Sequence, residues 1–256
     1  MHHPKHILIT GASSGIGAAL AEAYAAPGVR LSLHGRNLAR LDMVAEAAVG
    51  KGAVVTTKVG DVVYAESMSA WIENCDETQP IELVIASAGI SAGTGGKAES
   101  DVQARAIFAV NVNGVLNTVQ PAMAIMAKRG RGQIAILSSI AGFRGFPSAP
   151  AYCASKATVR IYGEALRAEL APKGIEINVV CPGFVKTPMT DVNNFPMPFI
   201  MSAARAARII KNGLTQNKAR IAFPWPMYWM VRLIAALPHD WTARLITRMP
   251  RKPAES

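Results

Sequence analysis

The segment Thr10-Gly11-Ala12-Ser13-Ser14-Gly15-Ile16-Gly17 lies between a short apolar run, residues 7–9, and a stretch with helical periodicity, residues 16–26. Glycines let a backbone turn tightly and approach a pyrophosphate, and the following helix N-terminus offers free N–H groups and a positive dipole end. The spacing is G-x-x-x-G-x-G, not the commoner G-x-G-x-x-G, and glycine-rich turns also occur for structural reasons alone. The strand–turn–helix context favours a dinucleotide site. The residues predicted to bind the dinucleotide here are Gly11, Ser13, Ser14, Gly15, Ile16 and Gly17.

Apolar runs alternate with helix-period segments beyond this point. The expected strands cover residues 7–9, 30–34, 53–59, 83–87, 133–138 and 175–180. The expected helices cover residues 16–26, 38–49, 65–73, 102–127 and 152–170. Near-continuous apolar strands that alternate with helices predict a parallel sheet covered on both faces. The predicted fold class is α/β, a Rossmann-like doubly wound parallel β-sheet in one domain over residues 1–256, with a C-terminal apolar and basic helical extension.

The composition limits the classes of function. Cys75, Cys153 and Cys181 have neither paired nor metal-like spacing, which is typical of a reducing compartment, and we expect no metal site. The N-terminal residues lack the pattern of a secretory signal, so we expect a cytoplasmic protein. The net charge is +10, and residues 201–256 hold ten Lys/Arg against two Asp/Glu. Because this excess is local and no known binding module accompanies it, we expect no nucleic-acid partner.

The end of the second expected strand bears on the choice between NAD and NADP. An acidic residue there would bind a ribose 2′-OH and repel a 2′-phosphate, but the sequence reads Leu33-His34-Gly35-Arg36-Asn37. The guanidinium fork of Arg36 suits a phosphate, and a solvated loop arginine is the alternative. After the third expected strand, Asp61 and Val62 could contact the adenine, or Asp61 could cap the next helix. The predicted cofactor is NADP(H).

A second constellation, Tyr152-Cys153-Ala154-Ser155-Lys156, opens an expected helix. Residues four apart share a helix face, so the Lys156 ammonium should lie near the Tyr152 phenol and lower its pKa from about 10. Tyr152 could then donate a proton to a carbonyl oxygen and take it back in the reverse reaction. Ser138 and Ser139 end the preceding strand, where a hydroxyl faces the ligand crevice of an open α/β sheet, although a serine that merely ends a strand is common.

Taken together, these segments resemble the short-chain dehydrogenase/reductase family in its single-domain form. The resemblance covers residues 6 to about 215 and rests on several weak motifs in one order and spacing. Besides those already quoted, the matching positions are Ala88-Gly89, Asn111, Pro182-Gly183 and Thr187. The match as a whole is much more specific than any one of its motifs.

The resemblance implies roles for these residues. Tyr152 would be the acid/base and Ser139 the hydroxyl that binds the carbonyl, since its separation from Tyr152 is the family's usual one. Lys156 would hold the nicotinamide ribose and tune Tyr152, and Asn111 would anchor a water in the proton relay. Pro182, Gly183 and Thr187 would line the nicotinamide carboxamide side, and Ala88 and Gly89 would also belong to the cofactor site.

One segment departs from the family pattern. Ala86-Ser87-Ala88-Gly89 stands where the family usually has Asn-Asn-Ala-Gly. The missing amides normally brace the central strands, and Ser87 can replace only part of that hydrogen bonding. We expect this to affect local rigidity more than chemistry.

The last quarter of the chain bears on the substrate and partners. Residues 186–215 are expected to form a substrate lid, and their Met and Phe side chains favour an apolar substrate, although they could simply pack on the domain. Residues 219–256 are expected to form a basic amphipathic extension, with helices from Met227 onward and over residues 240–249. Within this extension, the apolar run of residues 221–237 is near the short limit for a membrane span and contains two early prolines and Arg232, so a transmembrane helix is disfavoured. Its tryptophans and arginines within residues 221–252 suit a peripheral membrane contact, with a subunit contact or ordinary packing as the alternatives.

The function predicted from these residues is an NADP(H)-dependent oxidoreductase that interconverts a ketone or aldehyde and an alcohol, on an apolar or lipid-like substrate, with Tyr152 as acid/base. The alternative is a non-catalytic protein of the same fold that senses a cofactor or serves as a scaffold. The resemblance also implies a homodimer or homotetramer.

Overall fold

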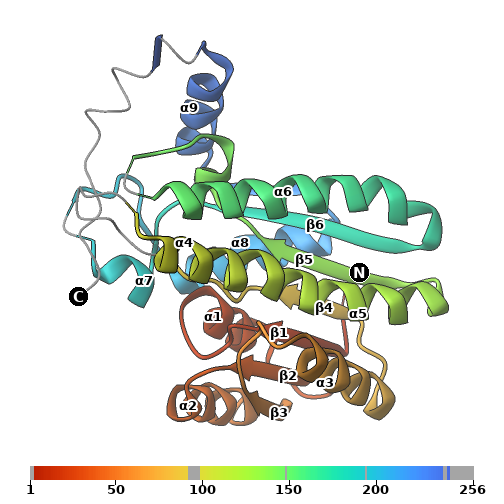
Figure 1. Cartoon of the computed structure of the whole chain (residues 1–256). Coiled ribbons are helices and arrows are strands. Elements are labelled where there is room, and N and C mark those ends of the chain that lie inside the picture. The colour runs from red at the N-terminus through yellow and green to blue at the C-terminus, as the bar shows by residue number, and fades with distance from the viewer. Residues whose placement is uncertain (1–2, 92–98, 148, 194, 239–240, 243–256) are drawn as a thin grey trace.

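The computed structural model describes residues 3–91, 99–147, 149–193, 195–238 and 241–242. Its centre is a seven-stranded parallel sheet with the strand order β3-β2-β1-β4-β5-β6-β9 (Figure 1). The strands of this sheet are β1 (His6–Thr10), β2 (Arg30–Gly35), β3 (Val54–Val59), β4 (Leu83–Ala86), β5 (Gly132–Leu137), β6 (Ile175–Pro182) and β9 (Arg220–Phe223). A separate two-stranded sheet pairs β7 (Val185–Lys186) with β8 (Met201–Ser202). The predicted Rossmann-like parallel sheet is confirmed.

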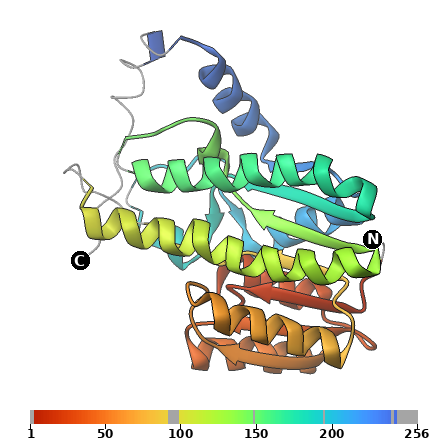
Figure 2. The same ribbon diagram turned by 45° about the vertical axis from the view of Figure 1, so that its right-hand side comes forward.

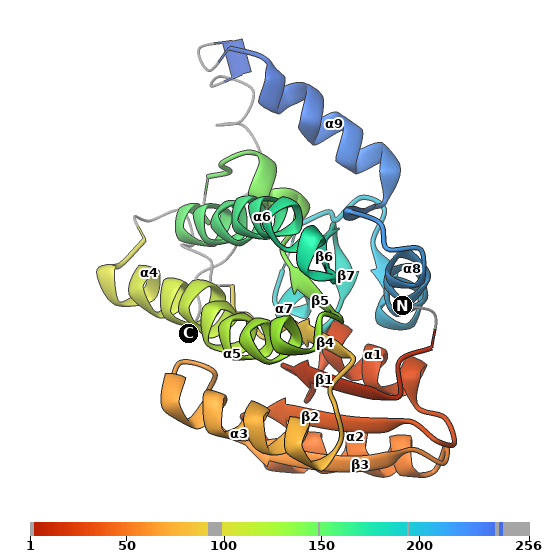
Figure 3. The same cartoon turned by 90° about the vertical axis from the view of Figure 1, so that its right-hand side faces the viewer.

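Helices cover both faces of the sheet (Figure 3). One face packs against α1 (Gly15–Tyr24), α2 (Leu38–Val49) and α8 (Ala203–Thr215). The other packs against α3 (Ala65–Thr78), α5 (Gly114–Arg129) and α6 (Pro150–Leu170). Within β1, Ile7 and Ile9 belong to the first core and Leu8 to the second, because successive strand residues point to opposite faces. This double cover explains why the central strands are almost continuously apolar.

The order of strands places a ligand crevice. The chain winds outward from β1 to β3 and then returns through β4 on the other side of β1. Loops at the carboxyl ends of β1 and β4 therefore diverge, and this is where open α/β sheets bind ligands.

The long helix expected over residues 102–127 is interrupted. It consists of α4 (Asp101–Phe108), a π-helical turn η1 (Ala109–Asn113) and α5. Asn111 lies in this turn, and its side chain bonds to backbone outside the helix instead of facing solvent. A π-turn inserts one extra residue per turn and so changes which side chains face inward, which periodicity alone does not predict.

The C-terminal part follows the βα rhythm further than the sequence indicated. The predicted lid segment continues into α8, whose Ala206, Ala207, Ile210 and Leu214 are fully buried against the sheet. β9 then adds a seventh strand beside β6. The helix expected from Met227 onward is α9 (Trp225–Ala236), whereas the one expected over residues 240–249 lies largely outside the described residues. No helix among the described residues is long and apolar enough to span a bilayer.

The remaining elements are short. They are two 3₁₀ turns, η2 (Ile140–Phe143) and η3 (Ala171–Lys173), and the one-turn helix α7 (Pro188–Asp191). Of these, η2 and α7 lie beside the crevice.

Candidate active site

A cavity of about 960 Å³ opens at the carboxyl ends of the central strands. Its lining includes Ser139, Tyr152 and Lys156 together with every residue predicted to bind the cofactor: Gly11, Ser13, Ser14, Gly15, Ile16, Gly17, Arg36, Asp61, Val62, Ala88, Gly89, Pro182, Gly183 and Thr187. Asn111 does not line it and is fully buried behind it. Residues separated by up to 176 positions in sequence thus share one pocket.

The loop between β1 and α1 forms what we call the glycine wall, residues 11–17. Gly11 has φ +67°, and a Cβ there would lie 2.7 Å from the Cα of Ala88. A Cβ on Gly17 would lie 2.2 Å from the carbonyl oxygen of Gly11. Ser14 caps α1 without a side-chain hydrogen bond, so its side chain leaves the first N–H groups of the helix unused. This backbone cradle fits the pyrophosphate of a dinucleotide.

The far end of the cavity lies at the end of β2. Arg36 is exposed, and its guanidinium lies 3.7 Å from the carboxylate of Asp61. Asp61 also accepts a hydrogen bond from the backbone N–H of Val63, at 3.2 Å, so it both faces the cavity and supports the turn before α3. Asn37 and Arg40 line the same end and were not predicted. This end therefore has two guanidinium groups and one carboxylate.

His34 is a further residue of this end that the sequence did not indicate. It is buried, lines the cavity and lies against the ring of Trp71 at 5.3 Å between centroids. Burial lowers the pKa of His34 to about 4, with the carboxylate of Asp61 opposing and Lys58 reinforcing that shift. The ring is therefore neutral at pH 7.

The turn after β4 carries the substitution noted in the sequence. Ser87 donates a hydrogen bond to the carbonyl oxygen of Thr10 at 2.7 Å, and its N–H donates to the Thr10 hydroxyl at 3.2 Å. These bonds tie β4 to β1 beside the glycine wall. A serine hydroxyl therefore supplies part of the bracing expected of an amide at this position.

Asn111 braces the next residues of that turn. Its Oδ1 accepts from the N–H of Ile90 at 2.8 Å, and its Nδ2 donates to the carbonyl of Ile90 at 2.9 Å and to the hydroxyl of Ser155 at 3.0 Å. Ser155 in turn donates to the carbonyl of Tyr152. Asn111 thus joins the β4 turn to the first turns of α6.

The two serines at the end of β5 have different partners. The Ser138 hydroxyl donates to the carbonyl of Lys156 at 2.7 Å, which ties the strand to α6. The Ser139 hydroxyl accepts from the N–H of Ala141 and makes a longer bond, 3.3 Å, to the carbonyl of Pro182. It also lies near enough to the phenol to oppose the rise in the pKa of Tyr152. Ser139 is therefore the serine that lies beside the phenol.

Tyr152 and Lys156 lie on one face of α6, with the Lys156 nitrogen 5.8 Å from the centre of the phenol ring. Lys156 donates to the carbonyl oxygen of Leu137 at 3.0 Å. Burial lowers the pKa of Lys156 to about 8. Burial also raises the pKa of Tyr152, and only the Ser139 side chain opposes it. The expectation of a lowered phenol pKa is therefore wrong for this arrangement, because the cost of burying a phenolate outweighs the contribution of Ser139 and the Lys156 cation does not reverse the shift.

The opposite side of the cavity is what we call the apolar wall. It is formed by Phe146, Phe184, Met189, Phe195, Met227, Met230, Val231 and Ile234. Of the predicted lid, only the segment up to residue 198 lines the cavity. Near the start of this segment, Thr187 forms a capping box with Thr190 at the N-terminus of α7. The last four residues belong to α9, whose place in the cavity the sequence did not indicate.

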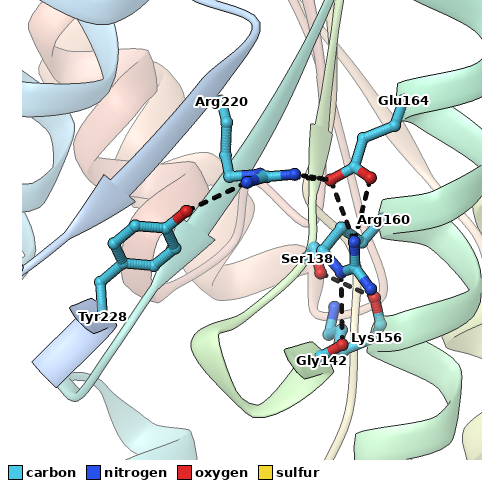
Figure 4. Close-up of polar contacts among 7 residues, drawn as sticks. All are labelled: Ser138, Gly142, Lys156, Arg160, Glu164, Arg220 and Tyr228. Atoms are coloured by element: carbon cyan, nitrogen blue, oxygen red, sulfur yellow. Dashed lines mark hydrogen bonds and ion pairs between the residues drawn. The ribbon is translucent and has the colours of Figure 1, made fainter. Parts of the chain in front are cut away.

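A polar cluster holds α9 against α6 (Figure 4). Arg220 of β9 donates to the hydroxyl of Tyr228 at 3.0 Å and also binds the carboxylate of Glu164. Arg160 binds the same carboxylate and donates to the carbonyl of Gly142 in η2. Its guanidinium also stacks 4.5 Å over the Phe143 ring. The cluster thus links α9, β9, α6 and η2.

Comparison with known families agrees with this geometry. The profile of the family described as "short chain dehydrogenase" matches residues 5–196. The chain belongs to the short-chain dehydrogenase family. It is therefore an oxidoreductase that acts on CH–OH or C=O groups with a nicotinamide cofactor.

Relatives of this short-chain dehydrogenase include proteins of similar length. An "uncharacterized oxidoreductase" of Myxococcus xanthus (strain DK1622) is 36% identical over 91% of this chain and 92% of its own. A "galactitol 2-dehydrogenase (L-tagatose-forming)" of Cereibacter sphaeroides is 37% identical over 71% of this chain and 72% of its own.

Solved structures share the fold along the whole chain. A short-chain dehydrogenase/reductase from Burkholderia phymatum in complex with NAD has TM-score 0.83 and 25% identity, and the match covers 100% of this chain and 99% of that one. A short-chain dehydrogenase from Sphingobium yanoikuyae in complex with NADPH has TM-score 0.79 and 23% identity, and the match covers 98% of both chains. The second likeness concerns the fold alone.

Proposed function

We propose that this enzyme is an NADP(H)-dependent reductase that converts an apolar ketone or aldehyde to an alcohol, and the reverse, with Tyr152 as acid/base. The observation that carries this proposal is that Ser139, Tyr152 and Lys156 line one cavity together with the glycine wall. Two hydroxyls that line one cavity can both reach one carbonyl oxygen, which is the geometry that general acid catalysis requires.

The cofactor would lie along the glycine wall, with its pyrophosphate at the N-terminus of α1 and its nicotinamide toward Pro182, Gly183 and Thr187. When bound, it supplies or accepts a hydride. Ala88 and Gly89 would lie beneath it, since both line the cavity, Ala88 next to Gly11 and Gly89 next to Lys156. Asp61 and Val62 would contact the adenine end.

The chain's own residues would move the proton. Tyr152 would donate its phenolic proton to the carbonyl oxygen, and Ser139 would donate a hydrogen bond to the same oxygen. Lys156 is a cation below pH 8, the value to which burial lowers its pKa, and would stabilise the phenolate left behind. Asn111 would act as a positioning residue, because it holds Ser155 and the Ile90 turn.

The preference for NADP(H) rests on Arg36. Its guanidinium lines the cavity where a 2′-phosphate would lie, Arg40 adds a second cation, and no carboxylate ends β2. Asp61 pairs with Arg36 and is the competing charge. We expect the 2′-phosphate to displace the Asp61 carboxylate from Arg36 or to share the guanidinium with it. A bidentate guanidinium–phosphate contact is stronger than the Arg36–Asp61 ion pair at 3.7 Å.

The preference for an apolar substrate rests on the apolar wall. Methionine and phenylalanine side chains provide an adaptable surface without groups that would recognise a sugar or a small acid.

We also propose that the enzyme assembles as a homodimer or homotetramer and works in the cytoplasm.

The acid/base assignment is tested with Tyr152→Phe. A panel of apolar and polar carbonyls is followed by the absorbance of NADPH, and kcat/KM is expected to fall by about 10²–10⁴-fold, the usual share of general acid catalysis. Binding of NADPH, followed by fluorescence, should change little. Undiminished turnover in this variant would refute the assignment, and a wild-type protein that binds cofactor but reduces no carbonyl would favour the non-catalytic alternative.

The cofactor preference is tested with Arg36→Gln. Loss of a charge-assisted contact should weaken NADPH binding by about ten-fold or more and leave NADH binding nearly unchanged. Arg105→Gln is the matched control, because Arg105 is an exposed arginine of α4 outside the cavity. Tighter binding of NADH than NADPH by the wild type would contradict the proposal.

A further inference from the structure

Helix α9 has two apolar faces that meet different surroundings. Its inner face carries Met227 and Val231, which are buried against Ile140 of η2 and line the cavity. Its outer face carries Trp225, Trp229 and Leu233, which are 72%, 56% and 66% exposed. Residues at i, i+4 and i+8 lie on one side of a helix, so these three side chains form a continuous stripe. We call it the outer stripe.

The position of α9 leaves this stripe accessible. Figures 1 and 2 show α9 at one edge of the molecule, set apart from the helices that cover the sheet. Trp241, five residues beyond the end of α9, is 75% exposed as well. Three of the four tryptophans of the chain, the two of α9 and Trp241, are therefore largely exposed, whereas Trp71 packs against His34.

The helix is held firmly on its inner side. Tyr228 accepts a hydrogen bond from Arg220, which is bound to Glu164 of α6 (Figure 4). Beyond the helix, Arg144 donates to the hydroxyl of Thr242, which is buried next to the exposed Trp241. The Tyr228 bond and the buried Met227 and Val231 hold the helix by its inner side, so the outer stripe is presented by an anchored element.

In the sequence, the charged residues of α9 and of the segment that follows it are mostly cationic. Helix α9 contains no acidic residue and carries Arg232, which is exposed beside the stripe. In the sequence, Arg244, Arg248, Arg251 and Lys252 follow, against Asp240 and Glu255. Amphipathic tryptophans next to a cationic segment match the headgroup region of an anionic bilayer, where indole rings sit at the interface and cations meet lipid phosphates.

The length of α9 limits how it could meet a bilayer. Twelve residues make a helix of about 18 Å, well short of the roughly 30 Å hydrocarbon core. Such a helix can lie in the interface plane and cannot cross it. We propose that the outer stripe of α9 docks the enzyme on the surface of an anionic lipid bilayer. Met230, which is 46% exposed and also lines the cavity, joins the docking surface to the mouth of the active site.

Sedimentation with vesicles tests this proposal on the full chain. Wild-type protein should bind mixed vesicles of phosphatidylcholine and phosphatidylglycerol more strongly than vesicles of phosphatidylcholine alone. High salt should remove this difference in binding between the two kinds of vesicle. Replacing the stripe with Trp225→Gln, Trp229→Gln and Leu233→Gln should reduce binding by about ten-fold or more, because each side chain loses apolar burial. All three are exposed, so the fold should be retained, which the melting temperature checks.

The matched control is Met43→Gln, Val49→Gln and Val54→Gln, which removes three exposed apolar side chains from α2 and β3. This variant should bind vesicles like the wild type. Equal losses in both triple variants would show non-specific adhesion and overturn the proposal, as would failure of the wild type to bind anionic vesicles.

Tryptophan fluorescence provides an independent measurement. Brominated lipids should quench the wild type strongly, and the stripe variant, which keeps Trp71 and Trp241, should lose most of that quenching. The competing occupant is a second copy of the chain. The stripe substitutions could instead dissociate an oligomer seen in solution, while brominated lipids leave the tryptophan emission of the wild type unchanged. In that case the stripe is a subunit contact and the proposal fails. Neither measurement uses turnover, so neither depends on the proposed reaction.

Discussion

The glycine wall and the apolar wall face each other across one cavity, yet different atoms form their surfaces. In the glycine wall the backbone makes the surface, and added atoms at Gly11 or Gly17 would meet main chain. In the apolar wall the surface is made by side-chain ends such as those of Met189, Met227 and Met230. The first surface is fixed by the fold, whereas the second can change with a side-chain rotation or a substitution.

This difference separates two requirements of the enzyme. A dinucleotide has the same pyrophosphate whichever carbonyl is reduced, so a rigid backbone site suits it. Substrates differ in shape, and thioether side chains adapt at low energetic cost. We expect substitutions in the glycine wall to affect folding and cofactor binding together, and those in the apolar wall to affect substrate choice alone.

The largest effect should come from a matched pair of glycine substitutions. In Gly17→Ala the new Cβ would lie 2.2 Å from the carbonyl oxygen of Gly11, so backbone must move. We expect the free energy of unfolding to fall by about 3 kcal/mol, the upper part of the range for overpacking, and NADPH binding to weaken strongly. In Gly183→Ala the nearest atom, at 2.7 Å, is the flexible Met227 sulfur, and the loss should be about 1 kcal/mol.

Urea denaturation of both variants, together with NADPH titration, gives the comparison. Equal losses in the two variants would mean that the apolar wall is as rigid as the glycine wall.

The glycine wall could be predicted from sequence because it is local. Residues 7–26 contain the strand, the turn and the helix that form it. The expectation of a pyrophosphate-binding site follows from this strand–turn–helix order alone. The same holds for Tyr152 and Lys156, which one helix brings together. Ser139 required one further step, since it depends on where the carboxyl end of β5 lies relative to α6.

The apolar wall could not be predicted in the same way. Helix α9 reaches the cavity only because β9 pairs with β6, with Val179 opposite Arg220, and this places Met227 against η2 more than 80 residues earlier in the chain. An apolar helix with tryptophans on one face fits a membrane, a subunit or a core, and sequence periodicity cannot separate them. The π-turn at Asn111 and the burial of His34 depend on similar long-range contacts.

A second prediction concerns Lys156, which lines the same cavity. Burial lowers its pKa from 10.5 to about 8. Below pH 8 the lysine is charged in both the folded and unfolded states, and the fold bears the full cost of burying the charge, about 3 kcal/mol. Between pH 8 and 10.5 only the unfolded state keeps the proton, so the cost disappears as the pH rises.

Lys156→Met should therefore stabilise the chain at pH 7 by about 2 kcal/mol, after the loss of the hydrogen bond to Leu137, and abolish turnover. The gain in the free energy of unfolding of the variant over the wild type should vanish near pH 10.5. The difference between variant and wild type is the quantity to measure, because burial raises the pKa of Cys181 to about 12 and that thiol destabilises the fold at high pH in both proteins. An advantage independent of pH would show that folding does not shift the pKa of Lys156 and would contradict the prediction.

The smallest effect should come from Tyr228→Phe, which removes one hydrogen bond between α9 and Arg220. The free energy of unfolding should fall by about 1 kcal/mol or less. Because Met227 and Met230 flank this residue and line the cavity, loosening α9 should raise KM for bulky apolar carbonyls by up to about five-fold, the factor that 1 kcal/mol allows. KM for a small carbonyl and NADPH binding should stay unchanged.

The matched control for this variant is Tyr162→Phe. Tyr162 accepts a hydrogen bond from Gln120 at 2.6 Å between α6 and α5, away from the cavity. It should lose a similar amount of stability without any change in substrate preference. If both variants shift KM for bulky substrates alike, the shift reflects general loosening of the fold, and α9 does not act as a separate wall. If only Tyr228→Phe does so, a single phenol on the outer edge of the molecule controls how the cavity accepts its substrate, and the apolar wall is adjustable in the sense that the glycine wall is not.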